Sequence, residues 1–195
     1  MDPDGRDITL HYDVKQQTNY YLQYSNAVRY LLSSNSKKLV HTIFQDLRVS
    51  DINITINFTI FKDFYNPHNK VINWNPLLTS YNPKTFVYNS PSIALMHELI
   101  HAWVDTTENG KNMFNSFLKR NQKNLDGYYE KHLSFFDKIK MSKETFYQES
   151  FATTLEQFIG QDLNEESSRK MYFDFDDTTA IHVKNEIDAG NYYER

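Results

Sequence analysis

Residues 97–101 read His-Glu-Leu-Ile-His, and this short run holds the residue types and the spacing that could do chemistry. Two histidines four positions apart on a helix lie one turn apart on the same face, so both imidazoles can reach one metal ion. Glu98 stands beside the first histidine, where its carboxylate could take a proton from a metal-bound water. The motif therefore predicts a metal site with His97 and His101 as ligands and Glu98 as general base.

The lack of cysteine limits which other ligands the site can have. The sequence has no Cys and seven His, so disulfides, thiol catalysis and every cysteine-containing metal site are excluded. Histidine and carboxylate ligands without thiolate suit a catalytic Zn²⁺ ion, which keeps one coordination position for water. The expected cofactor is therefore one catalytic zinc ion.

A third protein ligand is needed, and the residues after the motif exclude two arrangements. A metzincin-type site would have glycine at 104 and histidine or aspartate at 107, where this chain has Val104 and Thr107. The glutamate that follows His101 in a thermolysin-type site is also missing, because residues 121–124 read Asn-Gln-Lys-Asn. The remaining solution is a carboxylate on a later helix that packs against the motif.

A predicted helix over 142–160 carries three glutamates that could supply this carboxylate: Glu144, Glu149 and Glu156. Glu149 is favoured as the ligand, because small residues such as Ala152 beside it let this helix approach the motif closely. Glu144 lies in the first turn, where the helix dipole already accounts for an acid. Glu156 is the alternative ligand, or the acceptor for the N–H of a ligand histidine, or an exposed side chain.

The elements that must position these residues begin with helices and continue with strands. Helices are predicted over 17–34 and after the N-cap Ser36. Strict alternation of apolar residues from Ile52 to Ile60 predicts a half-buried strand, and residues 71–88 form a second extended region broken by two prolines. Within it, Trp74–Tyr81 is an edge strand that could pair with an extended polypeptide, or an ordinary sheet edge.

The second half of the chain is predicted to be helical. Ser90 and Pro91 are a helix start signal, so the motif lies on a helix over about 91–106, and Asn109-Gly110 is expected to end that segment. Further helices are predicted over 112–121, 127–140 and 142–160, the last opening at Ser142 and closing at Gly160. The order helices, strands, helices favours an α+β fold in one domain over 1–195.

The motif at 97–101, with Glu149-Ser-Phe-Ala152 downstream, resembles the gluzincin group of HExxH zinc metalloproteases. The Glu-x-Phe-Ala run is similar to the third-ligand helix of lethal-factor-like domains. The compact, cysteine-free chain is also similar to bacterial secreted effector and toxin proteases of the RavK-like kind, which cleave host actin. The resemblance implies a zincin-like fold of helices on a small, mostly antiparallel sheet, and a zinc endopeptidase that uses Glu98 as base.

Such proteases usually add a tyrosine or histidine that stabilises the oxyanion, and the sequence leaves several candidates open. They are Tyr128, Tyr129, Tyr147, His132 and His182. Asp105, one turn after His101, could accept the N–H of a ligand histidine, although capping or solvation would also explain it.

Charge and hydropathy exclude other classes of function. The net charge of −4 provides no basic field for a nucleic-acid backbone, and no apolar stretch predicts a membrane span. The first five residues, Met-Asp-Pro-Asp-Gly, lack the apolar segment of a Sec signal peptide. We expect a monomer that acts on a protein, actin if it is RavK-like, after non-Sec secretion into a host cytosol, or otherwise in the cytoplasm. The alternatives are an inactive, metal-containing binding module and a metal-free interaction domain with an accidental motif.

Overall fold

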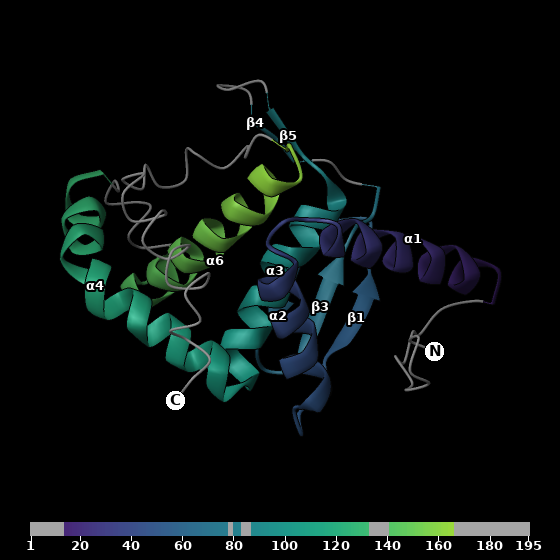
Figure 1. Ribbon diagram of the computed structural model, residues 1–195, viewed down its shortest axis with the longest axis horizontal. Helices are drawn as coiled ribbons and strands as arrows, with labels where there is room; N and C mark the ends of the chain where they lie inside the picture. Colours follow the sequence, from purple (N-terminus) through teal and green to yellow (C-terminus); the bar gives the residue numbers. More distant parts are fainter. Residues whose placement is uncertain (1–13, 78–79, 83–86, 133–140, 166–195) are drawn as a thin grey trace.

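Helices and strands follow one another in the order that the sequence pattern predicts, and the α+β class is confirmed (Figure 1). The computed structural model describes residues 14–77, 80–82, 87–132 and 141–165. The elements in these ranges are α1 (Val14–Leu32), α2 (Lys37–Val49), β1 (Thr55–Phe58), β2 (Phe64–Asn66), β3 (Val71–Trp74), β4 (Ser80–Asn82), β5 (Val87–Asn89), α3 (Pro91–Thr106), α4 (Glu108–His132) and α6 (Lys143–Asp162). None of the helices in this part of the chain is long and apolar enough to cross a membrane.

Helix α3 carries the motif and is surrounded by the other elements. It begins as predicted, because the Ser90 side chain accepts a hydrogen bond from the Ile93 amide and Pro91 occupies the first turn. Helices α1, α2, α4 and α6 and strands β2 and β3 all contact it. Because neighbours lie on all sides, α3 buries side chains around its whole circumference, including those of His97 and Glu98.

The main sheet has the strand order β1-β3-β2 and is mixed, so the expectation of a mostly antiparallel sheet is wrong. Strand β3 pairs antiparallel with β2, with Tyr65 opposite Ile72, and parallel with β1, with Ile56 opposite Ile72. The chain passes from β1 to the far edge of the sheet before β3 returns between the two. The central position goes to β3 because Ile72 and Trp74 are its buried residues, whereas β1 buries Ile56 alone.

The prediction that Trp74–Tyr81 is an edge strand is therefore wrong for the main sheet. Trp74 is the last residue of the central strand, and its indole N–H donates to the Pro91 carbonyl over 2.8 Å. Tyr81 belongs to β4, which pairs with β5 in a separate two-stranded sheet. The open edges of the three-stranded sheet are β1 and β2.

Strand β1 is shorter than the alternating pattern suggested. Its partner β3 spans only Val71–Trp74, and the register between the two strands ends where Phe58 lies opposite Trp74. Ile60, which the pattern placed in the strand, is 74% exposed.

The dipeptide Asn109-Gly110 lies in the first turn of a new helix, so the expectation that it ends the preceding segment is wrong. Helix α4 starts at Glu108 and covers both the predicted helix 112–121 and the described part of 127–140, of which 133–140 lies outside the described residues. A Cβ atom on Gly110 would lie 2.3 Å from the Trp103 carbonyl oxygen, so the close approach of α4 to the end of α3 requires glycine.

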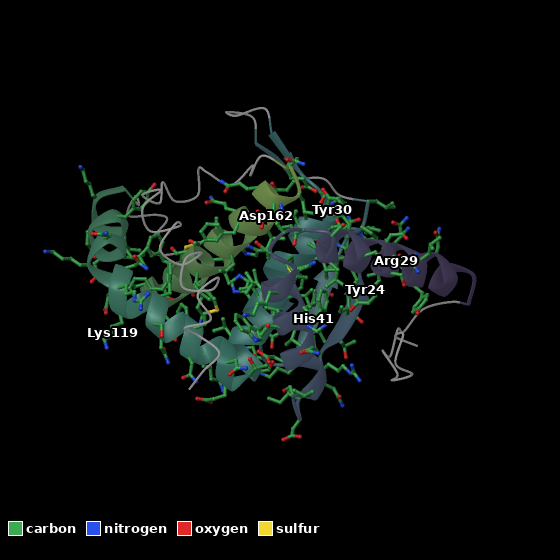
Figure 2. All side chains as sticks on the ribbon, viewed as in Figure 1. Tyr24, Arg29, Tyr30, His41, Lys119 and Asp162 are labelled. Atoms are coloured by element: carbon green, nitrogen blue, oxygen red, sulfur yellow. The ribbon has the colours of Figure 1, made fainter. Side chains whose placement is uncertain are left out.

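The C-terminal end of α6 is joined to α1 and α2. Ser36 stands at the N-cap of α2 as predicted, but its side chain bonds to the Asp162 carboxylate and makes no capping hydrogen bond. The Tyr30 hydroxyl donates to Glu165 over 2.6 Å, and a second oxygen of Glu165 accepts the Ser90 amide over 2.9 Å. Figure 2 shows Tyr30 and Asp162 at this junction, which ties the start of α3 to the end of α6.

Candidate metal centre

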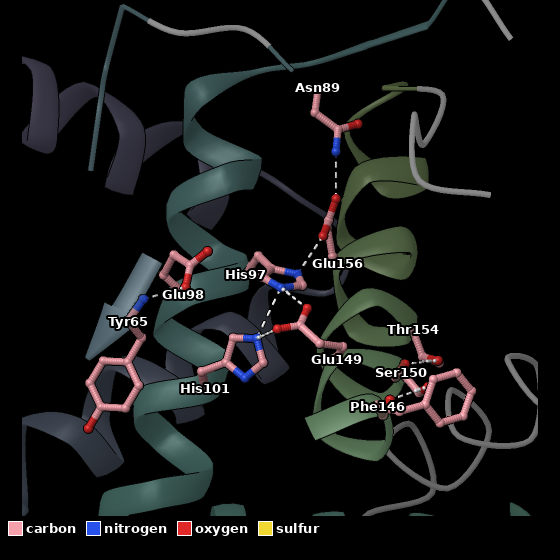
Figure 3. A network of polar contacts seen from close by, with 10 residues as sticks. All are labelled: Tyr65, Asn89, His97, Glu98, His101, Phe146, Glu149, Ser150, Thr154 and Glu156. Atoms are coloured by element: carbon pink, nitrogen blue, oxygen red, sulfur yellow. Dashed lines mark hydrogen bonds and ion pairs between the residues drawn. The ribbon is translucent and has the colours of Figure 1, made fainter. Parts of the chain in front are cut away.

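His97 and His101 from α3 and Glu149 from α6 meet between the two helices (Figure 3). Their ligand atoms all lie within 4.8 Å of one another. His97 Nε2 is 3.0 Å from His101 Nε2 and 3.2 Å from Glu149 Oε2, and His101 Nε2 is 3.4 Å from Glu149 Oε1. This His-His-Glu group could hold a metal ion, and it consists of the three residues that the sequence favoured.

Helix α6 places Glu149 there because its start and its packing face are both well defined. Ser142 caps it as predicted, with its side chain accepting the Thr145 amide over 3.1 Å, and the helix ends two residues beyond Gly160. The small residues Ala152 and Thr153 are both buried, and α6 packs directly on α3. Glu144 is exposed in the first turn, away from the group.

The histidines affect the pKa of Glu149. Burial by itself would raise the pKa of this carboxyl, but its hydrogen bonds and charge interactions with His101 and His97 outweigh burial and hold the pKa well below its usual range. Glu149 is therefore an anion at neutral pH, which is the form that a metal ligand needs.

Glu156 lies behind His97 and is 1% exposed. Its Oε2 is 2.7 Å from His97 Nδ1, and its Oε1 accepts a hydrogen bond from Asn89 Nδ2 over 2.5 Å. A carboxylate that accepts the proton of Nδ1 leaves Nε2, the nitrogen nearest Glu149, with the lone pair that a metal ligand needs. The sequence left three roles open for Glu156. The geometry matches the role in which its carboxylate accepts the N–H of a ligand histidine, here His97.

Glu98 faces β2, whereas the two histidines face α6 (Figure 3). It is 6% exposed, and its Oε2 accepts a hydrogen bond from the Tyr65 amide over 2.7 Å. At 3.6 residues per turn, Glu98 projects roughly 60° from His101 and 100° from His97 around α3. No side-chain pattern marks a backbone donor, so sequence reasoning missed the Tyr65 amide.

Asp105 contacts the β2–β3 hairpin, and the structure gives it none of the roles that the sequence left open. Its Oδ2 accepts the Tyr65 hydroxyl over 2.6 Å and lies 2.6 Å from Lys70 Nζ. Burial and the hydrogen bond to Asp105 raise the pKa of Tyr65 far above its ordinary value, so Tyr65 is a neutral donor. Asp105 lies near the C-terminal end of α3, where this hairpin is closer to it than the His-His-Glu group.

The tyrosines considered for oxyanion stabilisation have contacts elsewhere. The Tyr147 hydroxyl donates to Asp126, and the Tyr129 hydroxyl donates to the Met141 carbonyl over 3.0 Å. The ring of Tyr128 stacks on Phe146 with centroids 6.3 Å apart. The side chain of His132 and the whole of His182 lie outside the described residues. The structure therefore favours none of these candidates.

No protein-family model, no curated protein and no solved structure matches this chain. What the chain does is therefore inferred from the residues that α3, α6 and β2 bring together.

Proposed function

We propose that this chain is a zinc-dependent endopeptidase of the gluzincin type with a zincin-like fold. The observation that carries the proposal is the meeting of His97, His101 and Glu149 from two helices, with Glu98 next to the first histidine. This set contains every group that metal-assisted peptide hydrolysis requires except the oxyanion donor.

The spacing of the three side chains fits zinc. Ligand bonds of 2.0–2.1 Å in a tetrahedral site place neighbouring donor atoms roughly 3.3 Å apart. His97 Nε2 lies 3.0 Å from His101 Nε2 and 3.2 Å from one oxygen of Glu149, and His101 Nε2 lies 3.4 Å from the other oxygen. Two nitrogens and one carboxylate also leave a fourth position for water, as catalytic zinc sites do.

The chain's own residues then have separate tasks. Bound Zn²⁺ supplies Lewis-acid chemistry, polarising the scissile carbonyl and lowering the pKa of water. His97, His101 and Glu149 hold the ion, and Glu156 fixes the ring of His97 through Nδ1. Glu98 accepts the proton of the attacking water and delivers it to the leaving amine nitrogen.

The proposed substrate is a protein, and host actin is the first one to test because of the RavK-like resemblance. In that case the chain is an effector that reaches the host cytosol by a route other than Sec, and otherwise it acts in the cytoplasm. We propose that it acts as a monomer, without nucleic acid or membrane as partner.

A second candidate function is a metal-containing binding module without activity. The contacts of Tyr128, Tyr129 and Tyr147 favour it, because these described candidates for the oxyanion donor all pack or bond elsewhere. In this case the protein binds zinc but cleaves no protein that it is offered. A metal-free interaction domain, in turn, would contain no stoichiometric metal by elemental analysis.

The variant Glu98→Gln separates these functions. Glutamine keeps an oxygen that can accept the Tyr65 amide but cannot take up the proton of water. An active protease loses hydrolysis of fluorescein-labelled casein in this variant while zinc content stays at the wild-type level. Unchanged hydrolysis would contradict the proposed role of Glu98.

A further inference from the structure

Tyr65 contacts α3 at two places, with its backbone and with its side chain. The amide donates to Glu98 over 2.7 Å and the hydroxyl donates to Asp105 over 2.6 Å. Glu98 and Asp105 are seven residues apart, so they lie two turns apart on nearly the same face of the helix. Tyr65, in the edge strand β2, therefore contacts this face of α3 both at Glu98 and near the end of the helix, at Asp105.

Lys70 completes the contact from the turn between β2 and β3. Its Nζ lies 2.6 Å from Asp105 Oδ2, and its backbone has φ of 57°. This left-handed conformation favours glycine or asparagine, and a lysine there is held against its backbone preference. The ion pair with Asp105 gives a reason for lysine at this position.

We propose that Tyr65, Asp105 and Lys70 are positioning residues for Glu98. Together they form a clamp, the Tyr65–Asp105–Lys70 clamp, that fixes β2 against α3 so that the Tyr65 amide holds the Glu98 carboxylate in one orientation. The inference rests on the proposed function, because the orientation matters for chemistry only if Glu98 is the base.

The clamp has a direct consequence for the reaction. With Oε2 bound to the Tyr65 amide, Glu98 has Oε1 left to receive the proton of the attacking water. A base held in one orientation reaches the geometry of proton transfer at a lower entropic cost than a free side chain.

A purely structural role would predict a different pattern of effects. The side chains of Lys70 and Asp105 are 28% and 32% exposed, and ion pairs with this much exposure contribute little to folding stability. Loss of the clamp should therefore lower the turnover number, kcat, much more than it lowers stability.

The variants that test the clamp are Tyr65→Phe, Asp105→Asn and Lys70→Gly in the full, zinc-loaded chain. Glycine at 70 removes the ammonium group without straining the left-handed backbone. The matched control is Tyr30→Phe, which removes an equally short Tyr–carboxylate hydrogen bond of 2.6 Å at the other end of α3.

With fluorescein-labelled casein as the probe, each clamp variant should lose about tenfold in kcat, because small misplacements of catalytic groups are costly. KM should stay within about twofold, zinc content should equal that of wild type, and Tyr30→Phe should keep the wild-type kcat. Wild-type kcat in all three clamp variants, or an equal loss in Tyr30→Phe, would overturn the proposal.

Amide hydrogen exchange at Tyr65 tests the clamp without any activity. The Tyr65 amide should be protected in wild type and in Glu98→Gln, and should exchange faster in Glu98→Ala and in Asp105→Asn. Exchange of this amide at the wild-type rate in Asp105→Asn would overturn the proposal that the clamp holds β2 against Glu98. If zinc-loaded wild type cleaves neither casein nor any protein of a host-cell lysate, the proposed function fails, and the exchange rates still decide whether the clamp holds Glu98.

Discussion

At the residue scale, the buried carboxylate of Glu156 lies outside the proposed ligand set, and we expect it to affect metal affinity through His97. It lies between Asn89 and His97 and is almost completely buried. Acceptance of the proton of Nδ1 by this carboxylate would present the lone pair of Nε2 to a metal ion in the proposed site. The sequence could suggest this role from the spacing of Glu149 and Glu156, but the contact with Asn89 arises from β5 and no pattern indicates it.

Glu156→Gln tests this role, because the amide oxygen of glutamine is a weaker acceptor for the Nδ1 proton than a carboxylate oxygen. We expect the affinity for zinc to fall about 10- to 100-fold, the range found for such supporting carboxylates. Competition with a chromophoric chelator measures the affinity, and Glu144→Gln on the exposed first turn of α6 is the control. Equal zinc affinity in Glu156→Gln and wild type would show that Glu156 does not orient His97.

At the element scale, the helices that carry the site and the strand segments were predictable, but the pairing of the strands was not. Ser90 and Ser142 cap α3 and α6 as expected, since a capping serine acts within four residues of its own position. The order β1-β3-β2 depends on contacts between segments far apart in the chain, which local patterns do not encode. For the same reason, local patterns place the edge strand at Trp74–Tyr81. They also give no sign that the Tyr65 amide in β2 bonds to Glu98.

The junction of α3 and α4 gives a prediction with a matched control. In Gly110→Ala the new Cβ would meet the Trp103 carbonyl at 2.3 Å, so we expect a loss of about 2–4 kcal/mol in the free energy of unfolding. In Gly127→Ala, also in α4, a Cβ has nothing within 4 Å, and we expect a gain of up to about 1 kcal/mol. Urea unfolding measures both, and similar values for the two variants would contradict the close approach at Gly110.

The junction of α1 with the end of α6 predicts a dependence of stability on pH. Burial, and then the hydrogen bond and charge of Glu165, raise the pKa of Tyr30 from 10.0 to about 12. The folded protein holds this proton more tightly, so the stability from Tyr30 is complete below pH 10.0 and is lost as the pH rises to about 12. Tyr30→Phe should therefore show a shallower fall in the free energy of unfolding over this range, and an identical fall would contradict the prediction.

At the scale of the whole molecule, the fold places one helix at the centre and uses its faces differently. The His-His-Glu group lies between α3 and α6, and Glu98 and Asp105 meet the β2–β3 hairpin. The site therefore depends on contacts from the first and second halves of the chain. The motif at 97–101 predicts which residues could hold a metal ion, but only the three-dimensional structure reveals which face of α3 the strand β2 covers.

The central claim is that Glu98 acts as a base beside a zinc ion held by His97, His101 and Glu149. The most direct measurement compares new protein N-termini in a host-cell lysate after incubation with zinc-loaded wild type or Glu98→Gln, with zinc content measured for both. We predict one zinc ion per chain in both proteins and new N-termini only with wild type. Equal cleavage by the two proteins, or zinc-loaded wild type that produces no new N-termini, would contradict the claim.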